Sequence, residues 1–181
     1  TQKQPADVRV QDIADGFYWF LNEVARGVRE EFPGKWVTTT AYSGRIRPPE
    51  GVELVDSLSV HIALLGYSHH HRYDFPSWQT RERVTLYRRW GDICRFAVQR
   101  PYYPVMQFHC HVPLPLYRAH AANVRVLRDA GLRGSEWEAR CAFMADGLNP
   151  YVLARCLWDT DTDIEALLDD YYTAFFGPAA E

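Results

Sequence analysis

The sequence predicts an α/β fold in which parallel β-strands alternate with α-helices. Short segments of β-branched, aromatic or alternating residues are separated by longer segments whose apolar residues recur at helical spacing. A helix also lies between most consecutive strand candidates, as the crossover connection of a parallel sheet requires. The predicted strands cover residues 36–42, 58–65, about 104–112 and 132–138.

The composition is typical of one folded domain. The 181 residues are 47% hydrophobic and 14% aromatic, which is too apolar for a disordered chain and sufficient for a core. We expect an N-terminal tail or linker over residues 1–11 and a single α/β domain over 12–181. The net charge of −3 gives no electrostatic reason to expect a nucleic acid partner. No apolar run is long enough to predict a membrane span.

The first predicted helix covers residues 15–32 and is followed by the first strand. The apolar residues of this helix form one stripe, which consists of Phe17, Phe20, Leu21, Val24, Val28 and Phe32. Pro33 and Gly34 end the helix. The β-branched and aromatic residues of 36–42 then indicate a strand.

The second predicted strand, 58–65, is apolar almost throughout, which indicates burial on both faces. The connection from the first strand, residues 43–57, shows no clear helix. A loop over 66–76 follows the second strand and contains three consecutive histidines. Ser77 can cap a helix that ends near Cys94.

Strict alternation marks residues 104–112 as a strand with two different faces. Its apolar face consists of Met106, Phe108, Cys110 and Val112, and its polar face consists of Gln107, His109 and His111. This pattern suits a strand that packs on helices with one side and lines a polar interior with the other.

The C-terminal third continues the alternation of helix and strand. Its predicted elements are a helix over 116–130 that Gly131 ends, a last strand over 132–138, a helix over 151–158 and a final helix to Phe176. Thr160 or Asp161 can cap the final helix. A closed (β/α)8 barrel needs about 250 residues, so the residues alone allow either a small open sheet or part of a barrel.

Two long segments carry a family resemblance over about residues 12–180. The first combines Phe20–Ala25, Phe32–Lys35, Thr40–Tyr42 and Pro48–Pro49. The second combines Leu153–Asp159, Asp163, Leu167–Tyr172 and Phe176–Ala180. Both resemble the bacterial domain of unknown function 4838, which is itself similar to α-glucuronidase-like glycoside hydrolases.

The resemblance implies a fold and a function. It implies that the chain is the C-terminal half of a (β/α)8 TIM-type barrel, with the N-terminal barrel half elsewhere in the full protein. It further implies a glycoside hydrolase-like domain that acts on a polysaccharide or oligosaccharide, such as a glycan containing uronic acid. The resemblance also suggests a secreted or periplasmic location. We expect no cofactor.

The expected site lies where barrel strands end, at their C-terminal side. Glu136 and Glu138 stand two apart at the end of the last predicted strand and therefore point the same way. Either carboxylate could serve as a general acid, base or nucleophile, and we take both as candidate catalytic residues. The alternative is that both are solvated surface charges.

Histidines supply the next candidates. We expect His109 and His111 to line the interior and contact the substrate, and we expect His69 and His71 to face the substrate from the 66–76 loop. Zinc requires three or four ligands, and no further residue stands at a suitable spacing, so we predict no metal site. A metal-dependent hydrolase that uses His109 and His111 remains the least favoured alternative.

Tyr42, Asp74 and Trp137 complete the set of predicted substrate-binding residues. Aromatic rings often contact the apolar face of a sugar, although large aromatic residues also dominate protein cores. His61, in the second strand, is interpreted as a core or lining residue. A non-catalytic carbohydrate-binding barrel is the main alternative to a glycosidase.

Overall fold

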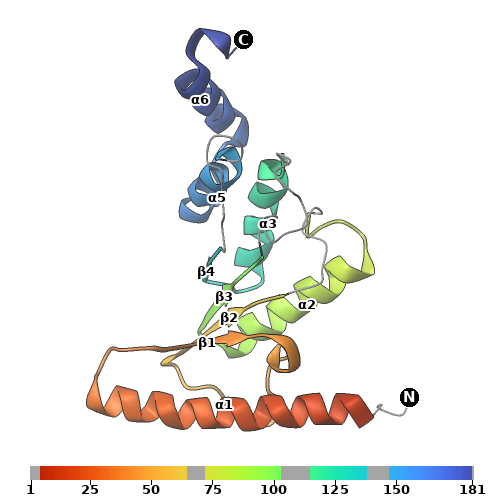
Figure 1. Ribbon diagram of the computed structural model, residues 1–181, viewed down its shortest axis with the longest axis vertical. Helices are drawn as coiled ribbons and strands as arrows, with labels where there is room; N and C mark the ends of the chain where they lie inside the picture. The colour runs from red at the N-terminus through yellow and green to blue at the C-terminus, as the bar shows by residue number, and fades with distance from the viewer. Residues whose placement is uncertain (1–4, 65–71, 103–114, 138–146, 181) are drawn as a thin grey trace.

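The computed structural model describes residues 5–64, 72–102, 115–137 and 147–180 (Figure 1). At its centre lies a four-stranded parallel sheet in the order β1-β2-β3-β4. The strands are β1 (Val37–Ala41), β2 (Leu58–Ile62), β3 (Phe96–Gln99) and β4 (Gly134–Ser135). The prediction of parallel βα units is therefore confirmed.

Five α-helices and two short 3-10 turns accompany the sheet in the described residues. They are α1 (Pro5–Glu31), η1 (Ser43–Arg45), α2 (Trp78–Ile93), α3 (Tyr117–Asp129), α5 (Leu148–Trp158), α6 (Ile164–Phe176) and η2 (Gly177–Ala179). Local chemistry sets several boundaries. The Ser77 hydroxyl accepts a hydrogen bond from the Thr80 amide at 3.1 Å and caps α2. Gly131 has φ +82° and follows α3, where a side chain would be strained.

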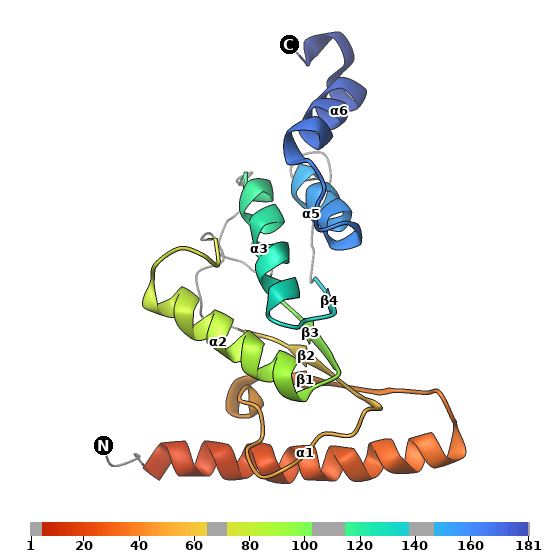
Figure 2. The same ribbon diagram turned by 180° about the vertical axis from the view of Figure 1, so that it is seen from behind.

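The strand order fixes on which side of the sheet the helices lie. Because the order is unreversed, successive right-handed crossovers place their helices on the same side. The main core cluster agrees, since it joins alternate strand residues to side chains of α1, α2 and α3. Its members include Ala41, Leu58, Val60, Ile62 and Ala97 from the strands, and Tyr18, Tyr87, Trp90 and Leu127 from the helices. Figures 1 and 2 show these three helices following one another around the sheet.

The connection between β1 and β2 has no α-helix and is held by side chains of neighbouring helices. The Trp90 indole N–H of α2 donates to the Ile46 carbonyl at 2.9 Å. The Asn22 side chain of α1, which is buried, accepts from the Val55 amide at 3.0 Å. These bonds satisfy backbone groups that a helical connection would satisfy internally.

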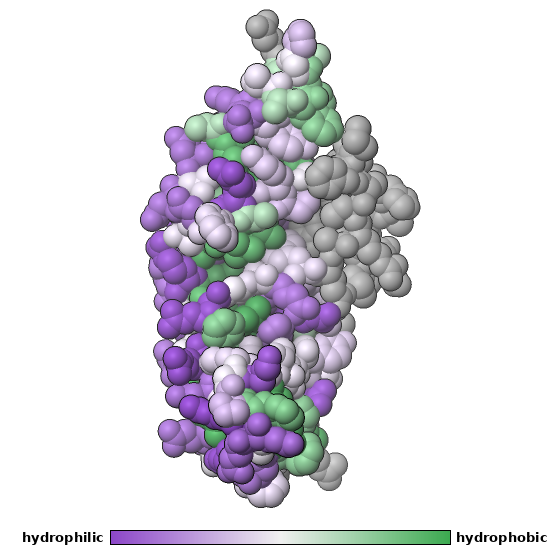
Figure 3. All heavy atoms as spheres, turned by 90° about the vertical axis from the view of Figure 1, so that its left-hand side faces the viewer, coloured by the Kyte–Doolittle hydropathy of each residue, from purple (hydrophilic) through white to green (hydrophobic). Residues whose placement is uncertain are grey.

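The second core cluster lies between α3, α5 and α6, beyond the sheet edge at β4. Asp163 caps α6 by accepting from the Glu165 amide at 3.0 Å, whereas the sequence predicted Thr160 or Asp161 as the cap. The end of α6 carries the exposed rings of Phe175 and Phe176, and this apolar surface is green at the top of Figure 3.

Two expectations differ from the structure, and one strand was not predicted. Helix α1 begins at Pro5, inside the segment predicted as a tail or linker. Its buried side is formed by Ala14, Tyr18, Asn22 and Ala25, whereas Phe20 and Val24 of the predicted stripe are exposed. The strand that follows α2 is β3 at 96–99, and the strand predicted at 104–112 lies outside the described residues.

Candidate functional site

The face of the sheet opposite the core helices is the open face. Side chains alternate along a strand, and paired residues of neighbouring parallel strands point to the same side. The register therefore assigns to the open face Thr38, Thr40, Ser59, His61, Phe96, Val98, Arg100, Gly134 and Glu136. Arg100 and Glu136 follow their strands directly, and backbone bonds to Ile62 and Gln99, at 2.9 Å and 2.8 Å, hold them in line with the ladder.

Three open-face side chains form a carboxylate cluster near the C-terminal ends of the strands. His61 Nδ1 is hydrogen-bonded to Glu136 Oε2, and Arg100 Nε lies 3.6 Å from the same oxygen. The side chains of His61 and Arg100 are 20% and 24% exposed, whereas that of Glu136 is 51% exposed. Two partly buried donors therefore hold a carboxylate that solvent can reach.

The cluster favours the ionised form of Glu136. The hydrogen bond from His61 lowers the pKa of the Glu136 carboxyl below its usual value, and the charges of His61 and Arg100 act in the same direction. Partial burial opposes this shift without reversing it. At neutral pH Glu136 is an acceptor of protons and hydrogen bonds, and not a proton donor.

Two tyrosines form an aromatic pair beside the cluster. Tyr42 follows β1 and Tyr102 lies two residues after Arg100, and their ring centroids are 6.3 Å apart. Strand β2 runs between β1 and β3, so the pair spans it. Ala63 follows β2 and is 1% exposed, and its amide donates to the Ala41 carbonyl at 2.9 Å.

Behind the cluster, on the helix side of the sheet, a buried amide connects β3 to β4. Gln99 is 1% exposed, and its Nε2 group donates to the hydroxyl oxygens of Tyr73 and Tyr87. Its Oε1 atom accepts from the Ser135 hydroxyl at 3.0 Å. Because Ser135 precedes Glu136, this network fixes the strand end that carries the carboxylate.

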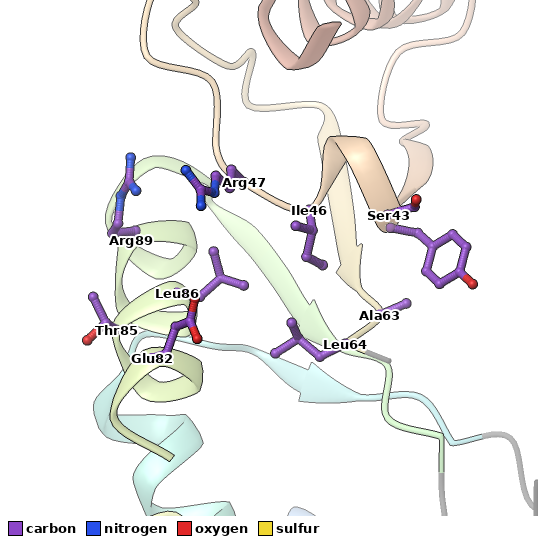
Figure 4. A pocket seen from close by; sticks show the side chains of 10 residues that line it. Ser43, Ile46, Arg47, Ala63, Leu64, Glu82, Thr85, Leu86 and Arg89 are labelled. Carbon is purple, nitrogen blue, oxygen red and sulfur yellow. The ribbon is translucent and has the colours of Figure 1, made fainter. Parts of the chain in front are cut away.

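A cavity of about 540 Å³ opens between the 42–47 segment and α2 (Figure 4). Tyr42 and Ala63 line it, so it begins beside the aromatic pair. Its other lining residues are Ser43, Ile46, Arg47, Leu64, Glu82, Thr85, Leu86 and Arg89. Ser43 has φ +53°, a left-handed conformation that is uncommon for a residue with a side chain.

The structure brings two of the predicted site residues, Glu136 and Tyr42, to the same end of the open face. It places Trp137 on the other side, where its ring packs edge-on against His120 with centroids 4.9 Å apart. Trp137 Nε1 also donates to the Ser135 hydroxyl at 2.5 Å, so this residue supports the strand end. Asp74 forms an ion pair with Arg72 in the segment before α2.

The remaining predicted site residues lie outside the described residues. They are Glu138, His69, His71, His109 and His111. Within the described ranges, no group of three or more His, Cys, Asp or Glu residues is arranged to hold a metal ion. No helix in the same ranges is long and apolar enough to cross a membrane.

Sequence reasoning missed Arg100 and left His61 without a functional role. Arg100 was overlooked because β3 was not predicted. The signal was present, since Phe96, Ala97 and Val98 form a short apolar run that stops before Pro101. For His61, its place two residues after Ser59 in a predicted strand indicated that both lie on the polar side of that strand.

Fold and site together define a parallel α/β domain with a polar, charged open face at the C-terminal ends of its strands. The chain belongs to the family described as Domain of unknown function (DUF4838), whose family model matches residues 4–181. Searches of curated proteins and of solved structures gave no match.

Proposed function

We propose that this chain is the C-terminal half of a (β/α)8 barrel that binds and hydrolyses a glycan, with Glu136 as a catalytic carboxylate. The observation that carries the proposal is the carboxylate cluster. An ionised glutamate, held by His61 and Arg100, lies on the open face near the C-terminal ends of parallel strands. This is the position at which (β/α)8 barrels place their catalytic groups.

The side chains of the open face support the barrel part of the proposal. In a barrel interior, layers of side chains come alternately from odd and even strands. Along the open face, Trp36, which precedes β1, and Phe96 of β3 pack with ring centroids 5.3 Å apart. Further along, His61 of β2 meets Glu136, which follows β4, and beyond them Tyr42 meets Tyr102 past the ends of β1 and β3.

The exposed surface of α1 supports a second barrel half as its partner. Trp19, Phe20 and Val24 are 59%, 57% and 37% exposed, although they are large and apolar. In a barrel, the helix before β1 would pack against the helix of the preceding βα unit. We propose that the N-terminal barrel half covers this surface and pairs with the edge of β1.

The chemistry of the cluster suits one of the two carboxylate roles in glycoside hydrolysis. A carboxylate that is ionised at neutral pH serves as a nucleophile or general base, whereas the general acid needs a raised pKa. Glu136 is the only acidic residue among the described strand positions of the open face. The proposal therefore assigns the general acid to another part of the protein, with Glu138 as one candidate.

The aromatic pair supports a sugar as the ligand. The faces of Tyr42 and Tyr102 offer apolar area beside charged hydrogen-bonding groups. A pyranose ring has the same combination, with C–H groups on its faces and hydroxyls at its rim. A carbohydrate-binding barrel without catalysis is the second candidate, because one carboxylate alone supports binding but not the two-carboxylate reaction.

Turnover by matched variants of the full-length protein tests the proposal. Glu136→Gln should lower kcat/KM on a cleaved glycan by about a hundredfold to ten-thousandfold while glycan binding persists. Glu138→Gln tests the second candidate, and Glu30→Gln on exposed α1 is the control. Unchanged turnover in both the Glu136 and Glu138 variants would contradict the catalytic assignment. Binding without turnover across a broad glycan panel would favour the non-catalytic barrel.

A further inference from the structure

The cavity between the 42–47 segment and α2 is lined by α2 on the helix side of the sheet and reaches the strand ends at Tyr42 and Ala63. The connection between β1 and β2 lines one side of it, and that connection contains the short turn η1 and no α-helix. Its volume of about 540 Å³ falls within the range of small-molecule sites, about 300–1,000 Å³.

The lining combines an apolar centre with charged side chains toward one end. In Figure 4, Ile46, Leu64 and Leu86 lie in the middle, the guanidinium groups of Arg47 and Arg89 lie at one end, and Ser43 and Ala63 lie at the other. Arg89 is paired with Glu50 at 3.3 Å. Neither Arg47 nor Glu82 forms an ion pair with another residue in the described ranges.

This pair of opposite charges limits the class of ligand. A simple anion would bind Arg47 but would be repelled by Glu82. A simple cation would bind Glu82 but would be repelled by Arg47. A wholly apolar ligand would bury both charges without a partner, which is costly. A neutral polyhydroxylated ring suits Arg47, Glu82 and the apolar centre together. Its hydroxyls can donate to Glu82 and accept from Arg47, and its C–H groups can contact the apolar centre.

We propose that this cavity is a second sugar subsite, which takes a neutral pyranose unit of a glycan whose neighbouring part lies at the aromatic pair. Tyr42 connects the two places, since it belongs to the aromatic pair and also lines the cavity. Ser43, the next residue, also lines the cavity and has a left-handed backbone conformation. This inference rests on the proposed glycan-binding function but needs no catalysis.

Methyl-resolved NMR of the full-length protein tests the subsite directly. The probes are the methyl glycosides of glucose, galactose, mannose and xylose, with the methyl glycoside of glucuronic acid as the charged counterpart. We expect at least one neutral glycoside to shift the methyl signals of Ile46 and Leu86, which line the cavity. Arg47→Gln and Glu82→Gln should each weaken that binding about tenfold, because each removes a charge-assisted hydrogen bond.

The controls separate this inference from the proposed function. Arg81→Gln, at an exposed α2 position that does not line the cavity, should leave the affinity unchanged. Glu136→Gln should also leave the Ile46 and Leu86 shifts unchanged, whatever it does to turnover. No shift at these methyls with any probe would overturn the subsite, and a response to the glucuronide alone would overturn its assignment to a neutral sugar.

Discussion

The side chains of His61 and Glu136 are hydrogen-bonded to each other across β3, although the strands that carry them are not neighbours. The contact joins residues 75 positions apart in the chain and lies on the face of the sheet away from the core helices. Arg100, from the strand end between them, adds a guanidinium group beside the carboxylate.

The first prediction concerns pH. The pKa of Glu136 is lower in the folded protein than in the unfolded chain, because His61 and Arg100 stabilise the carboxylate. The cluster therefore stabilises the fold at pH values above the unfolded pKa, and this contribution is lost as pH falls through the folded pKa. Since the side chain is half exposed, we expect the contribution to be less than about 1 kcal/mol.

Urea unfolding of the wild type and Glu136→Gln at a series of pH values measures this effect. The stability difference between the two proteins should shrink as pH falls from neutral into the acid range. In a His61→Ala background, NMR titration should place the pKa of Glu136 closer to its usual value. A stability difference that grows as pH falls would contradict the proposed cluster.

The second prediction concerns the buried amide of Gln99. Replacing Gln99 with Leu leaves the hydroxyls of Tyr73, Tyr87 and Ser135 without this partner in a buried place. We expect the free energy of unfolding to fall by about 3 kcal/mol, because unsatisfied buried polar groups are costly. Gln79→Leu, at a partly buried α2 position, should change it by about 0.5 kcal/mol or less. Equal effects of the two substitutions in chemical denaturation would argue against the network.

The third prediction concerns the contact between α2 and the end of α3. A Cβ atom at Gly91 would lie 2.0 Å from the Ala130 carbonyl oxygen, which is far inside contact distance. Gly91→Ala should therefore destabilise the protein by about 1–3 kcal/mol despite the better helix propensity of alanine.

Gly27 in α1 is the matched control, because a Cβ atom there meets nothing within 4 Å. Gly27→Ala should stabilise the protein by up to about 1 kcal/mol. Thermal unfolding that ranks Gly91→Ala at or above Gly27→Ala would show that α2 and α3 do not approach each other as described.

The fourth prediction concerns Ser43, whose φ of +53° costs free energy for any residue with a Cβ atom. Glycine adopts this conformation freely, whereas a β-branched side chain is the least compatible with it. We expect Ser43→Gly to be more stable than Ser43→Val by about 1–2 kcal/mol. Equal unfolding midpoints for the two variants would mean that residue 43 is not left-handed in solution.

Much of the fold was predictable because it depends on local chemistry. Ser77 and Gly131 mark helix ends by capping and by backbone conformation, and both were recognised from the sequence. The alternation of helices and strands correctly indicated a parallel sheet. Strand β3 was missed because it has only four residues and begins two positions after Cys94, so its apolar run reads as a continuation of α2.

The site was only partly predictable because it depends on contacts between distant residues. The sequence left Glu136 and Glu138 equivalent, and the pairing of the β4 end with Gln99 is what directs Glu136 to the open face. Trp137 looked like a sugar contact beside them, but alternation places it on the opposite side. His61, Arg100 and Glu136 are far apart in the sequence and share no motif, so only the pairing of the strands brings them together.

The double place of Tyr42, in the aromatic pair and in the cavity wall, has an evolutionary consequence. A change of side chain at position 42 alters both surfaces at once, because one ring belongs to each. Residue 42 is therefore constrained more tightly than Tyr102, which belongs to the pair but does not line the cavity. We expect relatives without an aromatic residue at 42 to differ in ligand preference at both places together.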